Sequence, residues 1–471
     1  MIARHALRAC AGIGLFAVLA ATPAHAVDVQ TLSAPKSEQI WYVSDHTLPM
    51  IAMTAAIPAG SAYDPQGKDG LAAFAASLLD EGAGRLNSNA FHTALANRAI
   101  RLSVTPERDY LLVQLVTLTD NARDAFRLLG QALAKPRFDA DAIQRVRAQM
   151  LSTLQQEDED PATVANKAFF HAYFHDHPYA HPIDGTAATI AAIGAGDLKS
   201  FAAAHWVNSG LKISVSGDVD PAMLNQLLKS AFGGLPTKAP AQPAMATHVG
   251  QPGVQVVAMD VPQPTVIFAM PGFLRADRDF LAGYVANYIV GGGGFSSRLT
   301  DQVREQRGLT YDISTSLDDY RHAGILFGQV ATKRGSVRQM MDVVRATLRD
   351  FAANGPTDKE LVDAKTYLTG SFPLAFSSNV DTAGQLNSFQ RSGLSVDYLQ
   401  KRNALIGAVT IDDVKRAARR LFNPNAMTVV VAGSLGEGGP APKTSIPQRP
   451  AAKGSAPAAV VGGPVHSQPR K

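Results

Sequence analysis

Two residues in the second half of the chain, Arg304 and Tyr311, are of types that could bind a peptide together. An arginine guanidinium presents a rigid fork of N–H donors, and a tyrosine hydroxyl can donate one further hydrogen bond. The two residues stand seven positions apart in the string SRLTDQVREQRGLTY, which begins at Ser297. If both project into one space, they could hold a peptide carbonyl or carboxylate. The alternative is that Arg304 is a solvated helix residue and Tyr311 an edge residue of the core.

A short helix between a glycine run and a strand must position this pair. Ser296 or Ser297 can cap the helix, because a hydroxyl oxygen accepts hydrogen bonds from the free N–H groups of a first turn. Leu299 and Val303 lie four positions apart, which predicts an apolar face that packs inward. Gly308 should end the helix, and the alternating run YDISTSL that follows predicts a strand. The glycines before the helix allow close approach to another backbone or a bound peptide, and we expect a loop at the cleft there: Gly291, Gly292, Gly293 and Gly294.

This segment resembles the corresponding segment of the pitrilysin and mitochondrial-processing-peptidase family, the inverzincin metallopeptidases. Further similarity extends over about residues 40–435. The resemblance implies that Arg304 and Tyr311 are the arginine and tyrosine with which that family binds substrate. It also implies a duplicated architecture with a peptide-sized cleft between two halves.

The zinc site of that family is missing from the matching segment, GLAAFAASLLDEGAGRLN, which begins at Gly70. Active members carry H-x-x-E-H on a helix, and a distal glutamate completes the ligand set. The resemblance places Ala73 and Ser77 at the two histidine positions, Ala76 at the glutamate and Thr153 at the distal glutamate. Alanine has no lone pair, and hydroxyls are poor zinc ligands beside imidazole or carboxylate. We therefore expect no zinc in this chain, and zinc in a partner subunit.

A cluster of histidines offers an alternative metal site. The string HAYFHDHPYAH contains four of them within eleven residues: His171, His175, His177 and His181. His171 and His175 stand one helical turn apart, which suits a zinc site. Against this, Pro178 breaks the segment, and a metal site needs preorganised ligands. A turn rich in histidine and proline is also common in the family that the chain resembles.

Grouped strands and long helices predict an α+β fold, with antiparallel sheets covered by helices in two homologous halves around a peptide cleft. The segment 197–218 recurs in style at 413–434, with aspartate, lysine and glycine at one constant offset. The runs YLLVQLVTL and PMIAMTAAI similarly match GILFGQVAT and PTVIFAM. The predicted boundaries are a signal peptide at 1–26, a first half at 27–235, a linker at 236–255, a second half at 256–435 and a disordered tail at 436–471.

The first 26 residues have the pattern of a cleavable export signal, with Arg4 and Arg8 before an apolar run and an A-x-A site at Ala24–Ala26. That run is too short to span a membrane, and we expect no transmembrane segment and a periplasmic location. Cys10, the only cysteine, lies within this signal. The chain has a net charge of +4, but without the signal and the tail it has 37 basic and 39 acidic residues. A nearly neutral body argues against nucleic-acid binding.

These observations favour a non-catalytic, substrate-binding subunit of a heterodimeric zinc peptidase. Arg304 and Tyr311 would act on an unfolded peptide at the zinc site of a homologous H-x-x-E-H subunit. Two alternatives remain, namely an inactive scaffold of the same fold and a peptide-binding protein that works without a partner. A pure scaffold has no need of the arginine and tyrosine in register, and this distinguishes it from the first hypothesis.

Overall fold

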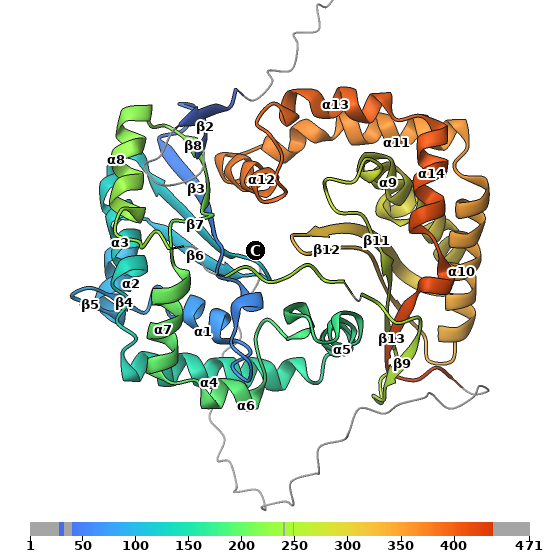
Figure 1. Ribbon diagram of the computed structural model, residues 1–471, viewed down its shortest axis with the longest axis horizontal. Helices are drawn as coiled ribbons and strands as arrows, with labels where there is room; N and C mark the ends of the chain where they lie inside the picture. The colour runs from blue at the N-terminus through green and yellow to red at the C-terminus, as the bar shows by residue number, and fades with distance from the viewer. Residues whose placement is uncertain (1–27, 33–39, 239–240, 248, 437–471) are drawn as a thin grey trace, which may run out of the picture.

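The computed structural model describes residues 28–32, 40–238, 241–247 and 249–436, arranged as two halves that each contain one large β-sheet. Figure 1 shows the first half on the left and the second half on the right. The predicted signal peptide and all but the first residue of the predicted tail lie outside the described residues. No helix in the described part is long and apolar enough to cross a membrane.

The first half contains eight strands, eight α-helices and three short 3-10 turns within the described residues. The strands are β1 (Gln30–Leu32), β2 (Ile40–Ser44), β3 (Met50–Ile57), β4 (Gly82–Ala83), β5 (Leu86–Asn87), β6 (Arg101–Pro106), β7 (Leu111–Leu118) and β8 (Lys212–Gly217). The helices are α1 (Leu71–Ser77), α2 (Ser88–Ala96), α3 (Ala122–Ala134), α4 (Ala140–Glu157), α5 (Pro161–Phe174), α6 (Ala187–Ala192), α7 (Ala195–His205) and α8 (Pro221–Phe232). The 3-10 turns are η1 (Ser61–Tyr63), η2 (Thr119–Asn121) and η3 (Pro178–Ala180).

The second half follows the same plan with five strands and six α-helices in the part of the chain that the structure describes. The strands are β9 (Gly253–Val257), β10 (Thr265–Pro271), β11 (Thr310–Tyr320), β12 (Ala323–Thr332) and β13 (Thr428–Ala432). The helices are α9 (Phe280–Asn287), α10 (Val337–Asn354), α11 (Asp358–Gly370), α12 (Asn379–Arg391), α13 (Tyr398–Ala408) and α14 (Ile411–Leu421). Two π-helical turns, η4 (Tyr288–Gly292) and η6 (Thr300–Glu305), and three 3-10 turns, η5 (Gly294–Ser296), η7 (Phe372–Phe376) and η8 (Pro424–Ala426), complete the half.

The two sheets share one topology. Their strand orders are β2-β8-β3-β7-β6, with β1 added at the edge, and β9-β13-β10-β12-β11. The strands matched to one another in the sequence, β3 with β10 and β7 with β12, occupy equivalent places. The α+β prediction is confirmed, but the expectation of antiparallel sheets is wrong for one pair in each half. β2 runs parallel to β8, and β9 runs parallel to β13. These are the first and last strands of their sheet-forming units, so the long chain between them allows a parallel crossover.

Each half has its own apolar core on one face of its sheet. In the first half, inward residues of β3 and β7 pack against α1, α3 and α8, and Phe74, Phe126 and Leu129 are fully buried. In the second half, β10 and β12 pack against α9, α10 and α14, with Phe268 and Phe351 fully buried. Burial of these side chains is the main favourable contribution to folding of each half.

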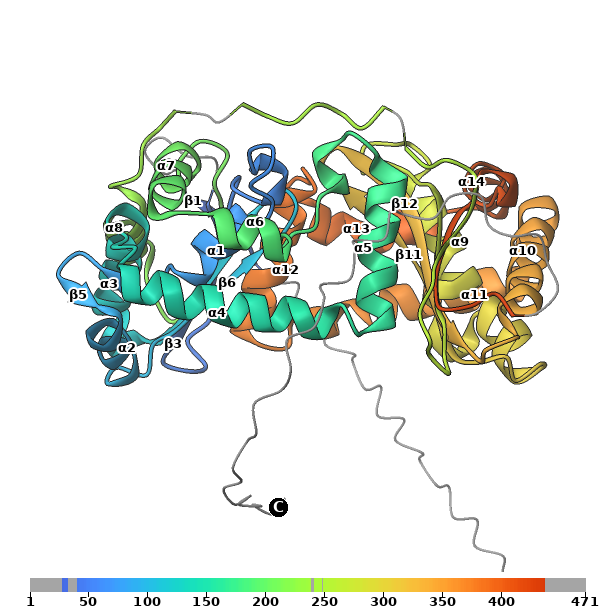
Figure 2. The ribbon, with the colours of Figure 1, turned by 90° about the horizontal axis from the view of Figure 1, so that it is seen from below.

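The opposite face of each sheet is covered by a helix that belongs to the other half. α5, from the first half, packs on β10 and β13 of the second. α12, from the second half, packs on β3 and β8 of the first. Figures 1 and 2 show both helices crossing between the sheets. We call α5 and α12 the exchanged helices. They occupy equivalent places, because β3 and β8 correspond to β10 and β13.

The two exchanged helices are held by different chemistry. α5 buries Phe169, Phe170 and Tyr173 against Ile267 and Val430. Its start is well specified, because the Asp160 side chain accepts a hydrogen bond from Thr163 N and a proline occupies the first turn.

α12 meets β3 and β8 mainly through polar side chains, while its Leu386 and Phe389 form an apolar cluster with Trp41 of β2. Asn387 Nδ2 donates to the carbonyl oxygens of Thr54 and Lys212, each at 3.1 Å. Ser214 Oγ donates to Gln390 Oε1 at 2.8 Å, and Ser216 Oγ bonds to the side chain of Asn379 at 2.6 Å.

Candidate functional site

The helix that would carry the zinc motif, α1, is intact but offers no metal ligand at the matching positions. Asp64 fixes the start of α1, because its carboxyl oxygens accept hydrogen bonds from the N–H groups of Gly70 and Ala72, both at 2.8 Å. Ala73 and Ala76 are 1% and 3% exposed and pack in the first core. The Ser77 hydroxyl donates to the Ala73 carbonyl at 3.0 Å, a common local bond in helices.

The distal position does not restore the ligand set. Thr153 lies on α4, which packs beside α1, and its side chain is exposed. Two methyl groups and two hydroxyls cannot provide the nitrogen, sulfur or carboxylate ligands that zinc requires. The residues at this site therefore do not fit a zinc ion.

Another group of potential metal ligands lies just after α1. Asp80, Glu81 and His92 form the one group of three or more such residues within ligand distance in the described part of the chain. Glu81 already forms an ion pair with Arg145 and accepts a hydrogen bond from Ser88 Oγ. The cluster is thus a salt-bridged surface group.

The histidines of the segment 171–181 do not converge on one point. His177 Nε2 lies 2.9 Å from the Ala244 carbonyl, and His181 lies beside Asp69. His175 ends α5 with a positive φ of 49°. None of them belongs to a group of three or more potential ligands among the described residues.

The predicted glycine loop lies against β11. Gly291 and Gly292 are in the π-helical turn η4, and a Cβ on Gly291 would stand 2.3 Å from Thr315 Oγ1. A Cβ on Gly292 would stand 2.9 Å from Asn287 Nδ2. Neither distance leaves room for a side chain, so these glycines permit close packing of the turn on the strand. Gly294 faces open space with a φ of +57°.

The helix after the loop begins and ends as the sequence predicts, although its middle is π-helical. Ser297 Oγ accepts a hydrogen bond from Thr300 N at 3.3 Å and lies 3.0 Å from Thr300 Oγ1. At the other end, Gly308 has a φ of +59° and its N–H donates to the Arg304 carbonyl, while Leu309 N–H donates to Val303 O. The bond from the left-handed Gly308 to the Arg304 carbonyl is the αL C-cap motif, in which glycine ends the helix. Leu299 and Val303 are fully buried, as predicted.

Arg304 stands on the last turn of η6, with its side chain 31% exposed. Its guanidinium lies over the ring of Phe295, with 4.5 Å between the guanidinium carbon and the ring centroid. An Nη1 atom is 3.4 Å from Glu305 Oε1. Arg304 is thus stacked on a neighbouring side chain as well as partly exposed.

Tyr311 lies at an irregularity at the start of β11, where the pairing with β12 shifts between Thr310 and Ile313. Thr310 Oγ1 bridges this bulge by donating toward the carbonyls of Asp312 and Ala331. Tyr311 is 79% exposed. It lines a cavity of about 500 Å³ on β11 and β12, and Arg304 is not among the lining residues. The structure thus places the pair on either side of one turn.

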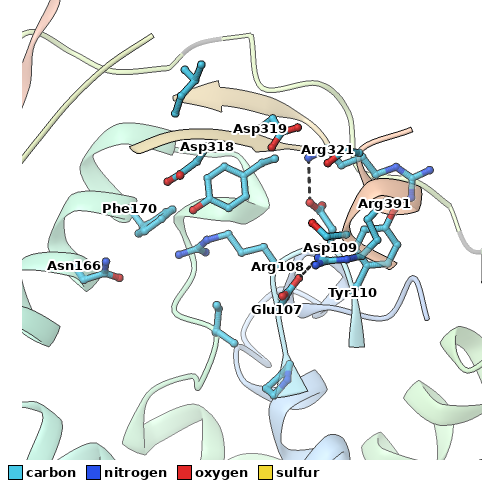
Figure 3. Close-up of a pocket in the computed structure, with 16 residues that line it drawn as sticks. Glu107, Arg108, Asp109, Tyr110, Asn166, Phe170, Asp318, Asp319, Arg321 and Arg391 are labelled. Atoms are coloured by element: carbon cyan, nitrogen blue, oxygen red, sulfur yellow. Dashed lines mark hydrogen bonds and ion pairs between the residues drawn. The ribbon is translucent and has the colours of Figure 1, made fainter. Parts of the chain in front are cut away.

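A second cavity of about 560 Å³ lies between the halves, where the tip of the β6–β7 hairpin meets the tip of the β11–β12 hairpin (Figure 3). We call it the central chamber. The exchanged helices supply further wall residues, including Phe170 from α5 and Arg391 from α12. A cavity open to solvent and lined largely by charged and polar residues therefore lies between the halves, where the cleft is predicted.

Polar contacts in the chamber wall connect the halves. Arg391 Nη1 donates to Glu107 Oε2 at 2.6 Å, and Arg321 N–H donates to Asp109 Oδ2 at 3.2 Å (Figure 3). Tyr179 OH also donates to Asp109 Oδ1, at 2.5 Å. The bond from Arg321 to Asp109 joins the two hairpin tips, and the bond from Arg391 ties α12 to the β6–β7 hairpin.

Burial changes the acidity of other chamber groups. Arg108 is 7% exposed, donates to the carbonyls of Tyr179 and His181, and lies 3.5 Å from the centroid of the Phe170 ring. Desolvation lowers the pKa of Arg108 to about 10. Desolvation likewise raises the pKa of the Asp318 and Asp319 carboxyls above their ordinary range. Burial thus disfavours the charged forms of all three groups.

Sequence reasoning missed the residues of the chamber. The sequence does contain a pattern that marks these residues. In each half, a charged string separates two apolar strands: PERDY at 106–110 and DDYRH at 318–322. Charged hairpin tips are usually solvated, so nothing in either string alone indicates that the two meet.

Comparisons with known proteins match each half of the chain to peptidase family M16. Residues 40–187 match the family described as Insulinase (Peptidase family M16), and residues 192–368 match the one described as Peptidase M16 inactive domain. Among curated proteins, the chain is 29% identical to the non-peptidase homolog YmxG of Helicobacter pylori over 424 residues, which cover 89% of this chain and 97% of that protein. It is 32% identical over 289 residues to an uncharacterized zinc protease of Streptomyces coelicolor, covering 58% of this chain and 61% of the relative.

Solved structures show the same fold. A peptidase M16 inactive domain from Pseudomonas fluorescens aligns with a TM-score of 0.81 at 28% identity, covering 86% of this chain and 98% of that one. A protease from Helicobacter pylori aligns with a TM-score of 0.80 at 18% identity, covering 87% and 100%, and supports the fold alone. With its two matching halves and its helix devoid of zinc ligands, this chain belongs to peptidase family M16 as a non-catalytic member.

Proposed function

We propose that this chain is the substrate-binding subunit of a heterodimeric zinc metallopeptidase that acts on unfolded peptides. A homologous subunit with H-x-x-E-H would carry the zinc ion, and this chain would contribute Arg304 and Tyr311. The observation that carries the proposal is a contrast within the chain. The first half has no zinc ligand at Ala73, Ala76, Ser77 or Thr153, whereas the second half presents Tyr311 79% exposed to solvent.

The exposure of Tyr311 argues against a merely structural role. A tyrosine at the edge of the core would bury most of its ring, as the tyrosines Tyr42 and Tyr179 do. The bulge at the start of β11 turns Tyr311 outward, and bulges are common next to functional sites. β11 is also the edge strand of its sheet, where an extended peptide can pair with free backbone groups.

The chemistry of the pair suits peptide hydrolysis at a partner's zinc site. The Arg304 guanidinium would donate to a carbonyl of the bound peptide and hold the chain in register. The Tyr311 hydroxyl would donate to the oxygen that becomes negatively charged as water attacks the scissile carbonyl.

The test is turnover of an unstructured fluorogenic peptide by the complex with an H-x-x-E-H homologue. We expect Arg304→Ala to lower kcat/KM by about 10- to 10²-fold, the order expected when one hydrogen bond from a charged group is lost. Arg307→Ala is the matched control, because Arg307 is an exposed arginine three residues further on that donates to the Gln302 carbonyl. Size-exclusion chromatography of both variants checks that the complex stays assembled.

Equal turnover of the wild type and the Arg304→Ala complex would refute the role of the pair and favour the inactive scaffold. Binding of unfolded peptide by this chain without any partner would favour the stand-alone peptide-binding protein. We place the complex in the periplasm, since residues 1–26 have the pattern of an export signal.

A further inference from the structure

Phe295 and Tyr311 are the two most exposed large apolar side chains in the part of the chain that the structure describes, at 77% and 79%. Both belong to the segment that carries Arg304. Exposed aromatic rings gain little for the folded state, and the ring of Phe295 lies directly against Arg304, which points to a binding role. The role of Tyr311 is part of the proposed function, whereas Phe295 has none yet.

The ring of Phe295 limits the freedom of the Arg304 side chain. The guanidinium carbon lies 4.5 Å from the ring centroid, within the range of a cation–π contact. An arginine side chain loses considerable rotamer entropy when it is fixed in one geometry. A contact that already restricts it in the free protein reduces this loss when a peptide binds.

The backbone that carries Phe295 is itself fixed. Ser296 bonds to the Gly293 carbonyl through both its N–H, at 3.3 Å, and its hydroxyl, at 2.9 Å. Ser297 N–H donates to the Gly294 carbonyl, and the Ser297 hydroxyl caps the following helix. The ring therefore projects from an ordered turn.

The same turn is tied to the strand of Tyr311. Gly291 packs against Thr315 of β11 so closely that a Cβ would overlap its hydroxyl. Asn287 Nδ2 donates to the Thr315 carbonyl at 3.1 Å, and Thr315 Oγ1 donates to Asn287 Oδ1 at 2.7 Å. The glycine loop, the helix of Arg304 and the start of β11 thus form one packed unit.

We propose that Phe295 is a positioning residue that holds the Arg304 guanidinium in its peptide-binding orientation through the contact of the ring with the cation. This inference rests on the proposed function of Arg304. It assigns to the glycine loop a task beyond close packing, because the four glycines bring an aromatic ring to the arginine.

The experiment is a double-mutant cycle in the complex with the H-x-x-E-H homologue, with kcat and KM measured for one unstructured peptide. Phe295→Leu keeps an apolar side chain but removes the π face, and we expect kcat/KM to fall about two- to five-fold, as for an exposed cation–π contact. Phe295→Tyr should restore turnover, because it keeps the ring. In an Arg304→Ala background, Phe295→Leu should have no further effect.

The high exposure of Phe295 keeps the test free of folding artefacts, and circular dichroism with a thermal melt checks this. Leu48→Ala, which changes another exposed apolar side chain in the first half, is the control and should leave kcat/KM unchanged.

Wild-type turnover in Phe295→Leu would overturn the inference. So would an equal loss in the Arg304→Ala background, because the ring would then act on the peptide directly. Failure of the proposed function has a different signature, which is wild-type turnover in Arg304→Ala alone.

Discussion

The two halves share a strand order, yet each holds the helix that it receives from the other by a different kind of contact. α5 is held by aromatic rings. Its Phe169 is fully buried and packs edge-on against Phe327, with 5.4 Å between the two ring centroids. α12 is held by hydrogen bonds from Asn387, Ser214 and Ser216. Apolar contact gives large, non-directional stabilisation, whereas hydrogen bonds give a smaller net gain but fix one register. Two helices in equivalent places of one fold can thus differ in whether apolar packing or hydrogen bonds dominate their contact with the sheet.

The halves also differ in the solvent exposure of their candidate site residues. In the first half, Ala73 and Ala76, the positions that the family resemblance matches to zinc ligands, are buried. In the second half, Phe295 and Tyr311 are exposed, and the ring of Phe295 lies against Arg304. The first half therefore buries its matching positions in its interior, whereas the second half presents aromatic side chains that its packing does not require.

The largest effect should come from breaking the apolar interface. Phe169→Ala removes a fully buried ring between α5 and the second sheet, and we expect the free energy of unfolding to fall by about 3–5 kcal/mol. Urea denaturation followed by circular dichroism measures this. A loss of less than 1 kcal/mol would show that α5 contributes little to holding the halves together.

The polar interface should be weaker. Asn387→Ala removes two hydrogen bonds to backbone carbonyls that also belong to the sheet, and we expect a loss of about 1–3 kcal/mol. The same denaturation experiment compares it with Phe169→Ala. If Asn387→Ala proved the more damaging change, the contrast between the two interfaces would be wrong.

The former zinc helix can be probed by restoring its histidines one at a time. Ala73→His forces a large side chain into a filled core and should cost about 1–3 kcal/mol. Ser77→His, on the exposed side of the same helix, is the matched control and should change the free energy of unfolding by at most about 0.5 kcal/mol. Equal effects of the two variants would contradict the view that only part of the old site has been absorbed into the core.

The smallest predicted effect is on the pH dependence of stability. His205, the last residue of α7, corresponds to Leu421, the last residue of α14. Its Nδ1 atom is buried without a hydrogen-bond partner in the described structure, and burial lowers the pKa of His205 below its ordinary value of 6.5.

The unfolded chain therefore takes up a proton at higher pH than the folded chain, so the free energy of unfolding falls as pH drops through about 6.5. His205→Leu, which copies the second half, should make the melting temperature less dependent on pH between about 7 and 5. Identical pH profiles of the variant and the wild type would contradict this.

The sequence predicted those features that depend on local spacing. The caps and the apolar face of the helix at 297–308 could be read from Ser297, Leu299, Val303 and Gly308, because each acts within one helical turn. The strands and the two halves followed from periodic apolar patterns and from the family resemblance. The absence of zinc ligands at the positions matched by the resemblance stays a prediction, read from Ala73, Ala76, Ser77 and Thr153.

Long-range features could not be predicted in the same way. The apolar face of α5 indicates that it packs on something, but periodicity does not tell which sheet receives it. A π-helical turn forms where a backbone N–H bonds to the carbonyl five residues back, as Gln306 N–H does to Asp301 O. Residue spacing does not tell this bond from the usual helical bond to the carbonyl four residues back. The stacking of Phe295 on Arg304 needs the fold of the glycine loop, which glycine alone leaves open.

The exchanged helices should keep the two halves associated after cleavage of the segment that joins them. The chain passes from the first half to the second between Leu235 and Gly253, outside any helix or strand of the described residues (Figure 2). A protease that cut there would sever the covalent connection, but α5 and α12 would still cover the opposite sheets. We therefore expect the two fragments to co-migrate under native conditions and to separate only in denaturant. Neither fragment could be produced alone as a soluble module, because each would expose the sheet face that the missing helix covers.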